Sequence, residues 1–432
     1  PWSNGAFSSP PGDPTNPNDS DSDDEGENDA AQNANGTEPK RLHANTGPDI
    51  TFIDSDGDSY SDGAESAFGS DPGNVDSCPD HTPAPTQPNI VIIYADDLGF
   101  GDISAYGRFF GTPSPTNTPN VDALAAQGVM FTQAHSSNGV CTPSRYALLT
   151  GKYNWREFNG ITNHFGGQMG GEEVPRPTDV TIAEFLKSQS YDTAAFGKWH
   201  LGGAFYTHDG TRVTGNPDTP NNIDWERPVE HHAVANGFDT FRGLAATINR
   251  GPYVYLVDDR VQYWDATLDG GAGAYRDATN RDTFRTITAA ELSSTVVGTK
   301  ASTPSLGDPS YKQVEPGPLM ISQVEEFIAA RASSGDTDPF FAYVSLYSPH
   351  FPQAITPPFV GSVGFHSGDF IKEVDHRIGR VIAAVDNGGF GDDTVIVFTS
   401  DNGPENGAMS ESLANGTDPN GPLRGNKRDV WD

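Results

Sequence analysis

Pairs of oxygen-bearing side chains follow two short apolar stretches of this sequence. Asp96 and Asp97 come directly after NIVIIYA, and Asp401 and Asn402 come directly after TVIVFTS. Carboxylate and amide oxygens are the hard ligands that Ca²⁺ and Mg²⁺ prefer, whereas zinc favours nitrogen and sulfur ligands. If the four side chains meet in space, they predict a site for one of these two divalent cations.

Cationic and proton-carrying side chains lie near the ends of other apolar stretches. Lys198 and His200 stand in GKWHLG after YDTAAF, and His350 stands in SPHFP after FFAYVSLY. Arg145 and Lys427 are two further cations, in CTPSRYALLTG and PLRGNK. Together with a divalent cation, these groups describe a site for a tetrahedral oxyanion, and they predict sulfuryl or phosphoryl transfer.

Cys141 is one of only two cysteines in the 432 residues, and it precedes Thr-Pro-Ser-Arg. Pro143 favours a helix that begins at Cys141, because a proline in the first turn lacks only an N–H that would have no helical partner. The free N–H groups of such a helix start favour a bound anion. Without its context, Cys141 would be interpreted as a small buried apolar residue. Two cysteines make no disulfide scaffold, and nothing in the sequence favours a bond between Cys141 and Cys78.

Apolar strand patterns alternate with amphipathic helix patterns from residue 88 onward. The predicted strands are PNIVIIYA, GVMFTQA, YDTAAFG, FFAYVSLYSPH and TVIVFTSDNG, and the predicted helices are VDALAAQG, CTPSRYALLTG, TDVTIAEFLKSQS, SQVEEFIAARAS and GDFIKEVDHRIGRVIAAVDN. This alternation predicts an α/β fold with a parallel sheet covered on both faces. The ligand site of such a sheet lies at the carboxyl ends of its strands, where the polar residues above should converge. The Gly-, Asn- and Asp-rich region 202–300 is interpreted as loops and inserts.

The first part of the chain has a different composition. Residues 1–47 are rich in Asp, Asn, Gly, Pro and Ser, which is typical of a disordered acidic linker. Residues 48–87 form a second linker that contains DSDGDSYSDGAE, a stretch that resembles the Asp-rich calcium repeats of secreted bacterial proteins. Its acidic residues match ligand positions of a calcium loop: Asp54, Asp56, Asp58, Asp62 and Glu65. Ser59 replaces the expected glycine of such a loop. Two interpretations therefore stay open: a second calcium site of low affinity, and a continuation of the acidic linker.

The formal charge of −33 argues against a nucleic-acid partner, because phosphate backbones attract the opposite sign. No apolar run reaches the length of a membrane span, and the chain shows no signal-peptide core. The acidic start and the calcium-type repeat suggest an exported protein that is secreted, periplasmic or at the cell surface. We interpret the chain as a processed or truncated piece of a longer protein.

Seven motifs carry a family resemblance, and they occur in one order between residues 88 and 427: PNIVIIYADDLGFGD, CTPSRYALLTG, GKWHLG, GFDTFRG, SPHFP, TSDNG and PLRGNK. With them the chain resembles the type I, formylglycine-dependent sulfatases of the alkaline-phosphatase superfamily. The resemblance implies a mostly parallel central sheet flanked by helices, within a catalytic domain at 88–432. It also implies a smaller C-terminal subdomain, which would be missing here.

The resemblance further implies that the chain hydrolyses sulfate esters. We expect a sulfated carbohydrate as the substrate, since the region 202–300 leaves room for a sugar-shaped pocket. Cys141 would be oxidised to Cα-formylglycine by a formylglycine-generating enzyme, and the hydrated aldehyde would attack sulfur. Its second hydroxyl would then expel sulfate, a step that a thiol cannot perform.

Roles for the other motif residues are implied in the same way. Ca²⁺, or else Mg²⁺, would be bound by Asp96, Asp97, Asp401, Asn402 and the modified Cys141. Arg145 would position the hydrated formylglycine, and Lys198 and Lys427 would hold sulfate oxygens. His200 would orient the nucleophile and assist elimination, while His350 would contact the sulfate and the bridging oxygen.

Two other functions remain compatible with the sequence. A phosphonate or phosphate ester hydrolase of the same superfamily can use the same modified cysteine, although GKWHLG and SPHFP favour a sulfatase. A non-catalytic, calcium-dependent carbohydrate-binding scaffold is the second, and the intact set of site residues argues against it. Turnover of phosphate diesters and binding of a sulfated glycan without sulfate release would distinguish them.

Overall fold

The structure of this chain is a computed structural model. It describes residues 87–112, 114–157, 174–213, 222–265, 274–277, 284–293, 296 and 304–429. The predicted linker at 1–47 and the candidate second calcium site at 54–65 lie outside these residues, as does Cys78.

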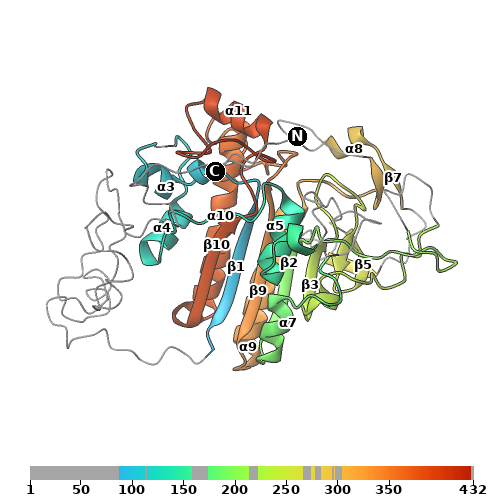
Figure 1. Cartoon of the computed structure of the whole chain (residues 1–432). Helices are drawn as coiled ribbons and strands as arrows, with labels where there is room; N and C mark the ends of the chain where they lie inside the picture. The colour runs from blue at the N-terminus through green and yellow to red at the C-terminus, as the bar shows by residue number, and fades with distance from the viewer. Residues whose placement is uncertain are drawn as a thin grey trace, which may run out of the picture. The chain divides into compact units, whose positions relative to one another are not determined.

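An eight-stranded sheet organises the described part of the chain, in the order β10-β1-β9-β2-β3-β4-β5-β6 (Figure 1). Its parallel part consists of β10 (Thr394–Ser400), β1 (Asn89–Asp96), β9 (Phe340–Pro349), β2 (Asp192–Lys198) and β3 (Thr240–Leu244). Its antiparallel part consists of β4 (Tyr255–Val257), β5 (Arg260–Asp265) and β6 (Ala274–Asp277). A two-stranded sheet joins β7 (Arg285–Ile287) to β8 (Ser305–Gly307). The mostly parallel sheet confirms the predicted α/β class.

Helices cover both faces of this sheet (Figure 1). One face carries α5 (Cys141–Thr150) and α7 (Ile182–Ser188), and the opposite face carries α9 (Pro316–Ser334) and α10 (His366–Asn387). The shorter helices are α3 (Ser104–Phe109), α4 (Pro119–Gln127), α6 (Asn154–Glu157), α8 (Ala289–Ser293) and α11 (Asn406–Ala414). Within the described ranges, none of the helices combines the length and apolar character needed to cross a bilayer.

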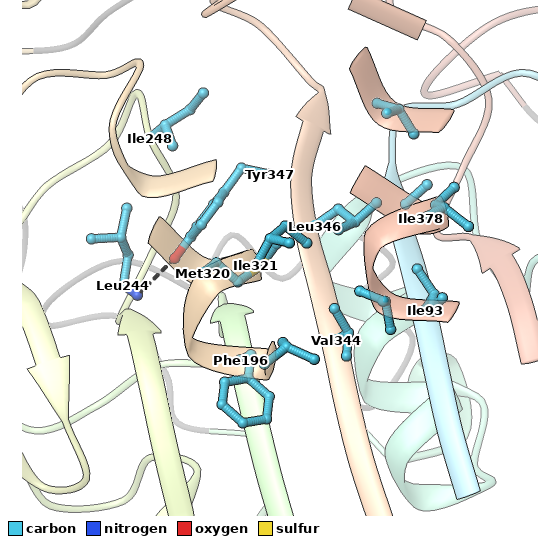
Figure 2. Close-up of a cluster of buried hydrophobic side chains, with 14 of the residues drawn as sticks. Ile93, Phe196, Leu244, Ile248, Met320, Ile321, Val344, Leu346, Tyr347 and Ile378 are labelled. Atoms are coloured by element: carbon cyan, nitrogen blue, oxygen red, sulfur yellow. Dashed lines mark hydrogen bonds between the residues drawn. The ribbon is translucent and has the colours of Figure 1, made fainter. Parts of the chain in front are cut away.

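Alternate residues of β1 pack into two separate hydrophobic cores, one on each face of the sheet. Ile93 belongs to the core beneath α9 and α10, while Ile92 belongs to the core beneath α5 and α7. In Figure 2, Met320 and Ile321 of α9 lie beside the sheet strands, and Ile378 of α10 lies near Ile93. Burying each such side chain stabilises the fold by about 1.5–3 kcal/mol. Because both faces of β1 are buried, its sequence is an unbroken apolar run.

Two local features of the core fix the ends of the strands that lead to the site. The Leu244 N–H donates to the Tyr347 hydroxyl at 3.1 Å, which joins the ends of β3 and β9 (Figure 2). Gly197 has a φ of 94°, and a Cβ there would collide with Ser345 and Met320. Only glycine adopts this backbone without strain, so Gly197 lets β2 deliver Lys198 to the sheet edge.

Two interpretations of the sequence were wrong. The described part of the region 202–300 contains β3 to β7 and α8. Strand β5 was missed because the exposed Arg260 stands next to the buried Val261, so the strand lacks the continuous apolar run of a central strand. GVMFTQA is not a strand: Val129 is 78% exposed and Phe131 is 67% exposed. Strand β1 already has β10 and β9 as its two neighbours, so the sheet offers this segment no pairing edge there.

Glu411 of α11 caps the first turn of α10 from outside the helix, and we expect Glu411→Gln to lower the melting temperature at neutral pH. Its carboxylate accepts the N–H groups of His366 and Ser367 at 3.0 and 2.9 Å. Removing the charge from such a cap costs about 1 kcal/mol. Burial opposes ionisation, but the hydrogen bond from Ser367 holds the pKa of Glu411 below its usual value.

The stabilisation by Glu411 is therefore present above the unfolded-state pKa of about 4.3 and is lost as the pH falls through the lower folded-state pKa. Differential scanning fluorimetry at neutral pH and at about pH 3 should show the gap between Glu411→Gln and the parent shrinking in acid. Glu326→Gln, at an exposed position of α9, is the matched control. A gap that is equal at both pH values would contradict the capping role.

Candidate functional site

The polar residues that follow the parallel strands meet at the carboxyl edge of the sheet. Asp96 ends β1 and Lys198 ends β2, while His350 follows β9 and Asp401 follows β10. Helix α5 begins at the same edge, where the Cys141 Sγ lies 3.5 Å from the Asp96 Oδ1. The strands of one parallel sheet thus bring together residues that are far apart in the sequence, as predicted.

Asp97 occupies a left-handed turn that directly follows β1. Its φ is 65°, a conformation that is uncommon for a residue with a side chain. The Asp97 N–H donates to the Asp401 Oδ1 at 3.1 Å, and the Asp401 N–H donates to the Ala95 carbonyl at 3.1 Å. These two bonds hold the strained turn and tie the ends of β1 and β10 together.

Three buried carboxylates each have a buried cationic partner. The closest nitrogen–oxygen distances are 2.7 Å for Lys198–Asp96, 2.6 Å for Lys427–Asp97 and 2.7 Å for Arg145–Asp401. The formal charges of these six groups cancel. Ionised groups are expensive to bury unless they are paired and hydrogen-bonded, so removing any single member leaves an uncompensated charge.

Cys141 lies in the middle of this charged cluster as a protonated thiol. Its Sγ is 3.3 Å from the Lys427 Nζ and 3.9 Å from the Asp97 Oδ1. Burial raises the pKa of Cys141 to about 12, although Lys198 and Lys427 favour the thiolate. A nucleophilic cysteine needs its thiolate form, so an unmodified Cys141 is poorly suited to attack a substrate at neutral pH.

The donor set can hold a divalent cation, and its oxygen atoms favour a hard one, although the Cys141 sulfur and the His350 nitrogen do not. Ligand atoms of Asp96, Asp97, Cys141 and His350 lie within 4.8 Å of one another. The Asn402 Oδ1 is buried without a hydrogen-bond partner among the described residues, while its Nδ2 donates to the Asp97 Oδ1 at 2.8 Å. A buried, unpartnered amide oxygen next to the Asp97 carboxylate is an acceptor that a cation would satisfy.

The contacts of Asp401 and His350 differ from the metal-ligand set that the sequence predicts. The Asp401 Oδ1 accepts the Asp97 N–H and its Oδ2 accepts from Arg145, so both oxygens already have partners. His350 instead stands among the potential ligand atoms, with its Nε2 3.7 Å from the Asp97 Oδ2. The sequence shows which residues reach the edge, whereas their mutual hydrogen bonds depend on side-chain geometry.

Both histidines of the site are neutral at neutral pH. Burial lowers the pKa of His350 to about 3, with a further contribution from Lys427, and burial also lowers the pKa of His200 well below its usual value. The His350 Nδ1 contacts the Phe351 carbonyl and must donate to it, since a carbonyl only accepts. The Nε2 of His350 therefore carries a lone pair and makes no hydrogen bond to the Asp97 carboxylate, whose Oδ2 lies 3.7 Å away. His200 lies beside the start of α5, where its carbonyl accepts the Thr142 hydroxyl at 3.1 Å.

Residues that hold Arg145 were missed by the motif analysis. The Arg145 guanidinium donates to the Ser345 hydroxyl and lies 5.2 Å above the ring centre of Tyr94. Ser345 in turn donates to the Lys198 carbonyl at 2.6 Å, so one hydroxyl connects α5, β9 and β2. The available signal was a hydroxyl residue inside the apolar run FFAYVSLY.

Comparison with known proteins places this geometry among enzymes of one family. A family model described as Sulfatase matches residues 88–432. The chain is 31% identical over 365 residues to the N-acetylgalactosamine-6-O-sulfatase of Bacteroides thetaiotaomicron, covering 80% of this chain and 65% of that protein. It is 32% identical over 347 residues to arylsulfatase A of Homo sapiens, covering 76% of this chain and 54% of that protein.

A solved structure from work on the metabolism of multiple glycosaminoglycans by Bacteroides thetaiotaomicron aligns with a TM-score of 0.60 and 29% identity. The alignment covers 79% of this chain and 69% of that chain. The chain spans about half to two thirds of the length of the curated relatives named here.

Proposed function

This chain belongs to the sulfatase family, and we propose that it hydrolyses sulfate esters of carbohydrates. The observation that carries the proposal is the position of Cys141, at the start of α5 and within 3.9 Å of Lys427, Asp96 and Asp97. Helix N–H groups and buried cations attract an oxyanion at this point, and the carboxylates attract a cation.

The buried cations and histidines would each have a separate role in the reaction. Lys198 and Lys427 would hold the sulfate oxygens, because the Lys427 Nζ lies 3.3 Å from the Cys141 Sγ and the Lys198 Nζ lies 2.7 Å from the Asp96 Oδ2. Arg145 would position the nucleophile, since Ser345 and Asp401 fix its guanidinium. Neutral His200 and His350 would exchange protons with the nucleophile and the leaving oxygen. Burial of these groups excludes water and strengthens each electrostatic contact.

Two groups that the family implies would complete the site. A bound Ca²⁺ would polarise the sulfate and neutralise charge in the transition state. We propose that Asp96, Asp97, Asp401 and Asn402 hold it, with Mg²⁺ as the alternative ion. Oxidation of Cys141 to Cα-formylglycine by a formylglycine-generating enzyme would supply the nucleophile that the protonated thiol cannot supply.

The choice of a carbohydrate substrate is supported by the relatives. The Bacteroides thetaiotaomicron relative is named for a sulfated N-acetylgalactosamine, and the aligned structure comes from work on glycosaminoglycans. Such substrates suit a secreted, periplasmic or cell-surface protein, and we propose that this chain is exported.

Mass spectrometry combined with a sulfate-release assay tests the proposed function. The chain is produced with a formylglycine-generating enzyme, and we expect the peptide that contains Cys141 to lose about 18 Da on conversion of thiol to aldehyde. The converted protein should release sulfate from N-acetylgalactosamine 6-sulfate or another sulfated sugar. Converted protein that cleaves a phosphate diester faster than any sulfate ester would favour the phosphonate hydrolase function. Binding of sulfated sugars without release would favour a non-catalytic scaffold.

A further inference from the structure

The His350 segment, residues 348–356, starts in the last residues of β9 and carries His350 to the site. Among the described residues, the His350 ring makes its one hydrogen bond to the carbonyl of its own neighbour, Phe351. Its Nε2 lies 3.7 Å from the Asp97 Oδ2, which is beyond hydrogen-bonding distance. The position of the imidazole therefore depends on how the backbone of this segment is held.

A buried ion pair on α10 binds the His350 segment on both sides of the histidine. Glu373 and Arg377 lie one turn apart on this helix, with a nitrogen–oxygen distance of 2.6 Å. The Arg377 guanidinium donates to the Ser348 hydroxyl at 2.9 Å, before His350. The Glu373 carboxylate accepts the Thr356 hydroxyl at 2.6 Å and the Thr356 N–H at 3.0 Å, after His350. The two charged side chains thus form a clamp on the segment.

The surroundings of the Glu373–Arg377 pair keep the clamp in one position. Glu373 is 1% exposed and Arg377 is 4% exposed, so solvent competes little for their hydrogen bonds. Hydrogen bonds to ionised groups are also about twice as strong as those between neutral groups. A Cβ at Gly317 would lie 2.6 Å from the guanidinium carbon, so the first turn of α9 packs its backbone directly against Arg377. The His350 segment is therefore anchored to two long helices.

We propose that Glu373 and Arg377 are positioning residues that hold His350 where it can transfer a proton to the leaving oxygen, an inference that rests on the proposed function. A general acid contributes about 10²–10⁴-fold to a rate, and a displacement of about 1 Å can remove about 10²-fold. The clamp acts through the backbone of the His350 segment, because its hydrogen bonds end on Ser348 and Thr356.

The leaving group decides how much a displaced His350 costs. A sugar alkoxide is a strong base, so it departs slowly unless its oxygen receives a proton. A nitrophenolate is a weak base that departs without one, so its ester needs little help from a general acid. Loss of the clamp should therefore slow sugar sulfates far more than 4-nitrophenyl sulfate, whereas a general loss of folded enzyme would slow both alike.

Kinetics with these two esters test the clamp on the chain produced with a formylglycine-generating enzyme. Glu373→Met combined with Arg377→Met removes both charges together, so no buried charge is left alone. We expect kcat for N-acetylgalactosamine 6-sulfate to fall by about 10- to 100-fold with KM little changed, and kcat for 4-nitrophenyl sulfate to fall by less than about 3-fold. Equal falls for the two esters, or no fall for either, would overturn the proposal.

Two further variants make this comparison independent of folding. Glu325→Met combined with Arg380→Met removes a half-exposed ion pair of 2.6 Å that joins α9 to α10, and it should leave the ratio of the two kcat values unchanged. Ser348→Ala deletes only the link to Arg377 and should shift the ratio in the same direction as the clamp variant. If the clamp variant does not fold, Ser348→Ala decides, and an unchanged ratio there overturns the proposal.

The imidazole signals of His350 test the clamp without turnover. The contact between the Nδ1–H and the Phe351 carbonyl should give a neutral Nδ1–H tautomer in a long-range ¹H–¹⁵N spectrum, assigned with His350→Gln. The clamp variant should shift or broaden these signals, and the Glu325–Arg380 control should not. A parent chain that cleaves neither ester would contradict the proposed function, while the spectrum would still decide the position of His350. Identical His350 signals in the parent and the clamp variant would overturn the positioning role.

Discussion

Replacing Cys141 with alanine should reduce sulfate ester hydrolysis by at least about 10³-fold. The Cys141 side chain lies inside the buried charged cluster, with Lys427, Asp96 and Asp97 all within 3.9 Å of its Sγ. Without a nucleophile, only binding and electrostatic stabilisation would remain. We expect kcat to fall while the affinity for a sulfated sugar changes little, because the cations stay in place. Sulfate release under saturating substrate measures the first, and calorimetric titration measures the second.

Two comparisons separate chemistry from folding for Cys141→Ala. The side chain is small, so its loss from the core should cost about 1 kcal/mol, and the melting temperature should fall by only a few degrees. Cys78→Ala removes the other cysteine and should leave turnover unchanged. Retention of more than about a tenth of the parent activity in Cys141→Ala would show that another group attacks the ester.

The strand ends could be predicted because central parallel strands are buried on both faces. NIVIIYA and FFAYVSLY therefore appear in the sequence as unbroken apolar runs, and the residue after each run must reach the carboxyl edge. Strand β5 could not be recognised in this way, since Arg260 and Val261 point to different environments. GVMFTQA failed for the opposite reason: its apolar residues Val129 and Phe131 are exposed and pair with no strand among the described residues, so apolar character alone did not make a strand.

Side-chain geometry at the site lay beyond the sequence. The motif CTPSRYALLTG identified Arg145 as a cation near the site, but Ser345 and Tyr94, which hold its guanidinium, lie inside ordinary apolar strands. A small cavity beside Asp102 is likewise invisible in GFGD, because it arises where the turn after β1, the end of β9, the first turns of α10 and the segment around α11 pack together. Motifs thus locate the reactive groups, and tertiary contacts decide what each group can bind.

Asp97→Asn should lower the stability of the ion-free protein by about 3–5 kcal/mol and abolish its stabilisation by Ca²⁺. The Asp97 carboxylate accepts from the Lys427 Nζ at 2.6 and 2.9 Å and from the Asn402 Nδ2 at 2.8 Å. A neutral amide leaves the buried ammonium of Lys427 without its counter-charge, and it brings an N–H₂ group against existing donors. The melting temperature with EDTA measures the first effect, and its rise on adding Ca²⁺ measures the second.

The pH dependence of the stability loss in Asp97→Asn gives an independent check. Burial opposes ionisation of Asp97, but Lys427 and His350 hold its pKa well below the usual value. A depressed pKa means that the carboxylate stabilises the fold above the unfolded-state pKa of about 3.9, and that this stabilisation disappears as the pH falls through the folded-state value. The difference between Asp97→Asn and the parent should therefore be full at neutral pH and should narrow in strong acid.

The same variant decides whether Asp97 is a metal ligand or only a partner of Lys427. Asp338→Asn removes a charge at an exposed position and should keep the full Ca²⁺-dependent rise in melting temperature. Loss of that rise in Asp97→Asn, together with loss of sulfate release, would assign the carboxylate to the cation. If Ca²⁺ raised the melting temperature of Asp97→Asn as much as that of the parent, the ion would bind elsewhere. Asp97 would then serve only to hold Lys427 beside Cys141.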